Sequence, residues 1–70
     1  MDKYKLEYFI NSKNMDKKSL CAALGLSSSA FYRKCRGVTE FTRSEIIEIA
    51  NILELSGEDI LSIFFTKEVS

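Results

Sequence analysis

Histidine and proline are absent from the 70-residue sequence, and glycine occurs only three times. The lack of proline and the scarcity of glycine disfavour a small all-β domain, whose turns are usually marked by these residues. They favour helices instead. Without histidine the chain lacks the commonest general base and the usual partner of a catalytic nucleophile. No nucleophile and base pair can be named, so we expect a binding module rather than an enzyme.

Cysteine is also scarce, with Cys21 and Cys35 the two present. A tetrahedral zinc site needs four ligands, usually thiolates and imidazoles, which this chain cannot supply. The first residues lack the apolar core of a secretion signal. We therefore expect a reducing, cytoplasmic location, with free thiols that pack in the core rather than a disulfide or a redox sensor. We expect no metal, cofactor, small-molecule ligand or membrane contact, since no apolar run approaches the roughly 20 residues that span a bilayer.

Charge is balanced overall but unevenly distributed, with ten basic and ten acidic side chains in the chain. Residues 13–43 contain seven lysines and arginines against two acidic residues, and the remainder contains three against eight. A basic middle within an acidic frame suits a molecule that presents one face to a polyanion. The alternative is that these charges are only a solvated surface.

Hydrophobic spacing predicts five short helices, connected tightly enough to form an all-α bundle. The helices are expected at residues 2–13, 17–24, 28–36, from 43 to about 53, and from 57 to about 65. Side chains suited to N-caps precede or open them, namely Asp2, Asp16, Ser27, Thr42 and Ser56. Gly25 and Gly37 follow the second and third helices, where a left-handed residue commonly ends a helix. With 70 residues we expect one domain, residues 1–70, and no separate ligand-sensing domain.

The stretch SLCAALGLSSSAFYRKCRG, residues 19–37, is the most informative part of the chain. It contains a predicted helix, a glycine turn and a second predicted helix, and it resembles the helix-turn-helix of the phage-repressor and Cro-like family of DNA-binding proteins. The matching features are Leu20, Cys21, Leu24, Gly25, Leu26, Ser27, Phe31 and Gly37. The resemblance covers nearly the whole chain and is strongest to small phage- or prophage-encoded members from Gram-positive bacteria. It implies that the second helix, residues 28–36, enters a major groove.

The resemblance also implies roles for individual residues. Base contacts are expected from Ser28, Ser29, Tyr32 and Arg33, and arginine is the natural bidentate partner of guanine. Phosphate contacts are expected from Lys17, Lys34, Arg36, Thr42 and Arg43. The serines are equally suited to being first-turn residues of a capped helix, and the arginines to being solvated charges.

The predicted function is that of a sequence-specific transcriptional regulator that occupies an operator in double-stranded DNA. The alternative is a protein-interaction adaptor on the same fold, similar to an antitoxin or an antirepressor. Zero net charge and two short serines on the reading helix favour that alternative. Salt dependence distinguishes the two, because binding to phosphates weakens steeply as salt rises.

The last predicted helix carries more apolar residues than one buried stripe needs. We expect Ile60, Leu61 and Phe64 to face the core. Ile63, Phe65 and Val69 are then left for the interface of a homodimer, which would bind a palindromic operator. In the alternative arrangement, Phe65 folds back over the first helix.

Overall fold

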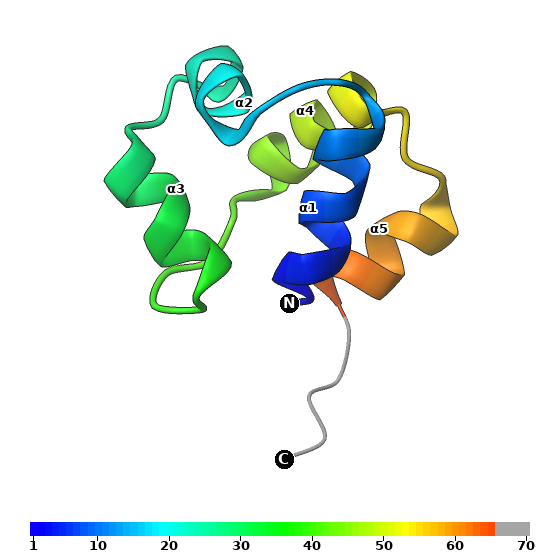
Figure 1. The fold of residues 1–70 in the computed structure, drawn as a ribbon. Helices are drawn as coiled ribbons and strands as arrows, with labels where there is room; N and C mark the ends of the chain where they lie inside the picture. The colour runs from blue at the N-terminus through cyan, green and yellow to red at the C-terminus, as the bar shows by residue number, and fades with distance from the viewer. Residues whose placement is uncertain (66–70) are drawn as a thin grey trace.

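A computed structural model of the chain describes residues 1–65, which form five α-helices and no β-strand (Figure 1). The helices are α1 (Lys3–Ser12), α2 (Lys17–Leu24), α3 (Ser28–Cys35), α4 (Arg43–Leu53) and α5 (Gly57–Phe64). The all-α prediction is confirmed, and each helix end lies within about one residue of its expected place. None of the helices in this described part is long and apolar enough to cross a membrane.

The helices begin at the predicted caps because each cap satisfies a backbone donor that the first turn leaves unpaired. In all five, a side-chain oxygen of the cap accepts a hydrogen bond from the backbone N–H three residues later. Thr42 and Ser56 go further and form reciprocal capping boxes with Glu45 and Asp59. Gly25 ends α2 with a φ of 70°, a conformation that favours glycine, and this sharp turn directs the chain into α3.

The core is a single cluster to which every helix contributes. Its buried members are Leu6, Ile10, Leu20, Cys21, Phe31, Ile49, Leu53 and Ile63. Phe41, in the loop between α3 and α4, packs against this cluster, and its ring makes edge-to-face contacts with Phe31 and Phe64 at centroid distances of 5.7 and 5.6 Å. The packing of Phe41 anchors the loop that follows α3.

The predicted inner face of α5 is wrong at two positions. Ile63 is fully buried, whereas Leu61 is 61% exposed. The stripe that faces the core is therefore Ile60, Ile63 and Phe64, which has the i, i+3, i+4 spacing of one helix face. The chain start is joined to this end of α5, because the backbone N–H of Asp2 donates to the carbonyl of Ile63 at 2.7 Å. Ile63 cannot serve as the exposed interface residue that the sequence predicts.

Helix α2 contributes Leu20 and Cys21 to the core, whereas Ala23 is exposed. Burial raises the pKa of the Cys21 thiol, and it raises the pKa of the half-buried Cys35 thiol to about 11. Both thiols are free and remain protonated at neutral pH, which makes them poor nucleophiles.

Candidate nucleic-acid interface

Helix α3 projects from the left edge of the bundle in Figure 1, with α2 above it. Its inner side is anchored by Phe31, which is buried in the core. Its outer side carries five exposed residues, which we call the reading face: Ser28, Ser29, Tyr32, Arg33 and Arg36. These residues fall in two adjacent rows at four-residue spacing, so they form one continuous surface.

The first residue of α2 lies close to the start of the reading face. Lys17, Ser28, Ser29 and Tyr32 line one shallow pocket of about 330 Å³, with Cys21 and Phe31 also in its lining. The structure thus brings together three of the predicted base contacts and one predicted phosphate contact. Gly25 and the buried contact of α2 with α3 make this possible, because they bring the two helix starts to the same side of the molecule.

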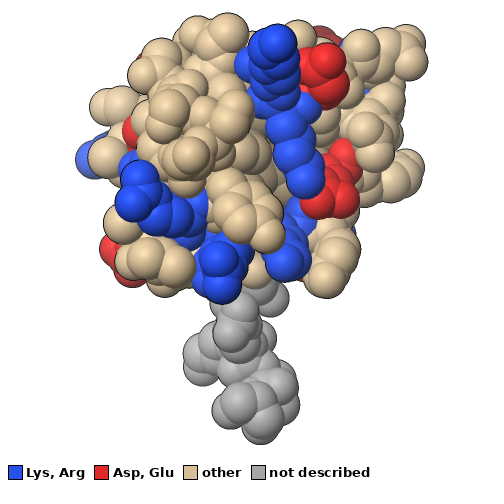
Figure 2. Space-filling view, turned by 60° about the vertical axis from the view of Figure 1, so that its left-hand side comes forward, with Lys and Arg blue, Asp and Glu red and all other residues tan. Residues whose placement is uncertain are grey.

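The arginines provide positive charge that no carboxylate of the described residues pairs with. Arg33, Arg36 and Arg43 are exposed, and none forms an ion pair with another of the residues 1–65. The guanidinium of Arg36 lies over the Tyr32 ring, 5.6 Å from its centroid, and this cation–π contact restrains both side chains. In Figure 2 the side of the molecule that carries α3 is turned toward the viewer. On this side, Lys and Arg side chains form an arc around a largely uncharged centre.

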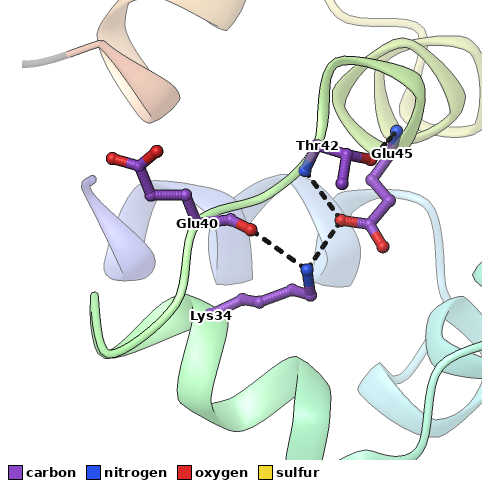
Figure 3. A network of polar contacts seen from close by, with 4 residues as sticks. All are labelled: Lys34, Glu40, Thr42 and Glu45. Atoms are coloured by element: carbon purple, nitrogen blue, oxygen red, sulfur yellow. Dashed lines mark hydrogen bonds and ion pairs between the residues drawn. The ribbon is translucent and has the colours of Figure 1, made fainter.

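The surroundings of Lys34 argue against the predicted phosphate contact (Figure 3). Its ammonium donates to Glu45 Oε1 at 2.9 Å and to the backbone carbonyl of Glu40 at 3.0 Å. The side chain is only 14% exposed, and it lies 5.8 Å from the centre of the Phe41 ring. Lys34 therefore joins α3 to the start of α4 and is withdrawn from the surface.

The same network limits the hydrogen bonds that Thr42 can donate to an outside group such as a phosphate. Its backbone N–H donates to Glu45 Oε1, and its hydroxyl oxygen accepts from the backbone N–H of Glu45. Only the hydroxyl hydrogen of Thr42 then remains for an outside acceptor. Burial alone raises the pKa of Glu45, but the hydrogen bonds from Thr42 and Lys34 outweigh it and hold the pKa below its ordinary value.

The lowered pKa of Glu45 predicts a loss of stability in acid. A carboxyl group with a depressed native pKa stabilises the fold above its unfolded value, near 4.5, and this contribution is lost as the pH falls through the native pKa. We expect the free energy of unfolding, measured by urea denaturation, to fall between about pH 5 and pH 3. Glu45→Gln should start less stable at pH 7 and show a smaller fall. The matched control is Glu48→Gln, an exposed position on the same helix, which should keep the wild-type fall. An equal fall in Glu45→Gln would contradict the assignment.

One residue near the interface was not predicted at all. Glu7 of α1 accepts a hydrogen bond from the ammonium of Lys17, with 2.6 Å between Oε1 and Nζ. This bond raises the pKa of Lys17 above its ordinary value, so the lysine stays charged. The two residues belong to different helices, and no local spacing in the sequence signals their contact.

A second surface lies between α4 and α5, and it is largely apolar. A groove of about 670 Å³ there includes Ile47, Ala50, Leu55, Ile60 and Phe65 in its lining, with Arg43 and Asn51 as the polar members. Ile47 and Phe65 are 51% and 61% exposed. Of the three predicted dimer residues, Phe65 borders this groove, Ile63 is buried in the core, and Val69 lies outside the described residues.

Comparison with known protein families gives a match to this chain. The family model for the Cro/C1-type HTH DNA-binding domain matches residues 5–65, which includes all five helices except the first two residues of α1. Neither the curated proteins nor the solved structures provide a match to the chain.

Proposed function

Because the chain belongs to the family of Cro/C1-type helix-turn-helix DNA-binding domains, we propose that it is a sequence-specific regulator of transcription with a Cro- or repressor-like role. Helix α3 enters the major groove of an operator, with its N-terminal residues nearest the base edges. The observation that carries this proposal is the reading face, five exposed side chains on one surface opposite the buried Phe31. Bound there, the domain blocks or recruits the polymerase.

The side chains of the reading face differ in length and chemistry, and we assign them different contacts with DNA. Ser28 and Ser29 are short and suit close approach to base edges at the start of α3. Arg33, four residues after Ser29, reaches further and can donate two parallel hydrogen bonds to guanine O6 and N7. Tyr32, restrained by Arg36, contacts a thymine methyl group or a phosphate.

Phosphate contacts surround this centre. Lys17 at the start of α2, Arg36 at the end of α3 and Arg43 at the start of α4 are the three cations that we assign to the backbone of the duplex. Each of the three side chains is exposed, and Lys17 also borders the pocket beside the reading face. Lys34 has no part in this set.

Neutralising one of these cations should change the salt dependence of binding by a predictable amount. Arg43→Gln is expected to lower the slope of log K against log salt concentration by about one unit per bound domain, with similar weakening on every duplex. The measurement is fluorescence anisotropy with a labelled duplex at several salt concentrations. Lys5→Gln, the same change in charge on α1, is the control and should leave the slope unchanged. Equal slopes for wild type and Arg43→Gln would remove Arg43 from the footprint.

Salt titration also tests the proposed function against the adaptor alternative, which the zero net charge favours. Three phosphate contacts predict an affinity loss of about 40-fold per domain between about 50 and 200 mM salt, and on the order of 10³-fold for a dimer. An adaptor has no such salt-sensitive affinity for duplex DNA. Absence of measurable binding at about 50 mM salt would favour the adaptor.

We also propose that the domain binds as a two-fold dimer through the groove between α4 and α5. The exposed Ile47 and Phe65 supply apolar area there, as is usual at homodimer interfaces. The molecule measures 31 × 24 × 20 Å. Two copies in contact are therefore large enough to hold their α3 helices about 34 Å apart, one turn of DNA. A palindromic operator follows from this symmetry.

Sedimentation of Phe65→Ser tests the dimer. The wild type is expected to dimerise at tens of micromolar, and the variant to dissociate at least about fivefold more readily, because a central aromatic contact is commonly worth more than 1 kcal/mol. Tyr8→Ser removes an equally exposed aromatic from α1 and should leave dimerisation unchanged. A wild type that stays monomeric at high micromolar concentration would exclude the dimer and leave the DNA-binding proposal intact.

A further inference from the structure

The contact between Glu7 and Lys17 has an effect on DNA binding that the proposed function does not include. Of the three cations assigned to phosphate, Lys17 is the one that already holds a carboxylate among the described residues, at 2.6 Å. Both side chains remain accessible, with Glu7 39% and Lys17 52% exposed. The pair joins the middle of α1 to the first residue of α2, so a cation at the edge of the reading face is partly neutralised before DNA arrives.

The position of Lys17 allows it to exchange partners. Its side chain borders the pocket that contains Ser28, Ser29 and Tyr32. It also borders a second pocket of about 190 Å³ between α1 and α3, where Glu7 is part of the lining. Tyr32 lines both pockets, so Lys17 lies between Glu7 and the reading face. A lysine side chain has four rotatable bonds, and rotation about them moves the ammonium from one side to the other without a change in the backbone.

We infer that Glu7 limits the affinity of the domain for DNA by competing with a backbone phosphate for Lys17. This inference rests on the proposed function. When a phosphate binds Lys17, the ion pair with Glu7 breaks and its carboxylate is left close to a polyanion. An exposed ion pair contributes little free energy, so Glu7 adjusts the affinity by several-fold and does not block binding.

Glu7→Gln keeps the size of the side chain and removes the charge. At about 50 mM salt it is expected to bind a duplex about two- to fivefold more tightly than the wild type. Screening weakens the competition as salt rises, so the two proteins should converge near 200 mM. The slope of log K against log salt concentration should accordingly be steeper for the variant, by up to about one unit. Glu54→Gln is the matched control, because it makes the same change in charge and breaks the exposed pair of Glu54 with Lys13. Its affinity should equal that of the wild type.

A second background separates competition for Lys17 from general repulsion of DNA. Lys17→Met is expected to bind the duplex more weakly than the wild type. Adding Glu7→Gln to Lys17→Met should raise the logarithm of the affinity by less than half as much as Glu7→Gln does in the wild type. The same gain in both backgrounds, or no gain in the wild type, would overturn the inference while wild-type DNA binding stands. A wild type that binds no duplex would overturn the proposed function, and this inference with it. Thermal unfolding of each variant confirms that the fold is retained.

Discussion

Replacing Ile63 with alanine is expected to lower the free energy of unfolding by about 2–5 kcal/mol. The side chain is fully buried in the core, and its loss leaves a cavity where α5 meets the rest of the bundle. A 70-residue domain has only a few kcal/mol of net stability. A large fraction of the variant should therefore be unfolded at 25 °C. Urea denaturation followed by circular dichroism measures the difference.

Leu61→Ala is the control for this prediction. It makes a similar change in size two residues earlier on α5, at a position that is largely exposed. The expected cost is within about 0.5 kcal/mol. If Leu61→Ala were costly and Ile63→Ala were not, α5 would have the rotation that the sequence alone predicts, and the apolar groove beside α4 would need to be reassigned.

Arg33→Ala is expected to have the largest effect on recognition. Binding to the preferred duplex should weaken by about 1–3 kcal/mol, and the preference at one base pair should be relaxed. The reason is that Arg33 is exposed, has no carboxylate partner among residues 1–65, and follows Ser29 by one turn on the reading face. Affinities for the preferred duplex and for a scrambled one, measured at one salt concentration, give the result.

The matched control is Arg36→Ala, at the end of the same helix. We assign Arg36 to phosphate, so its loss should weaken both duplexes by a similar factor. The contrast between the two arginines is the test. Equal weakening of both duplexes by Arg33→Ala would make Arg33 a phosphate contact only, and base recognition would then need another residue.

Local signals in the sequence predict most of the fold. Caps such as Ser27 and Thr42 and the turn at Gly25 act within a few residues, so the chain fixes them without help from distant parts. The rotation of α5 is different, because the segment from Ile60 to Phe65 contains five apolar residues in six. Several stripes fit that pattern equally well. Packing of Ile63 against the other four helices selects one of them, and the bond from Asp2 to Ile63 joins the two ends of the described chain.

In the candidate site, too, local sequence signals predict some features, and contacts between distant residues determine the others. Helical spacing alone predicts the exposed rows of α3. It does not show whether a lysine on such a helix forms an ion pair with a carboxylate from another part of the fold. Lys34 is held by Glu45 across the loop, and Lys17 by Glu7 from α1. For Lys34 the sequence does contain a signal, since it follows the buried Phe31 by three residues and so falls near the inner side of α3. No comparable signal points to Glu7.

Selection of bound duplexes from a random pool tests the central claim most directly. We predict an enriched motif whose half-sites repeat with two-fold symmetry about 10 base pairs apart, and whose guanine preference weakens when Arg33→Ala is used for the selection. A pool that remains random after several rounds, with wild-type protein that is folded and binds DNA at low salt, would contradict sequence-specific recognition by α3.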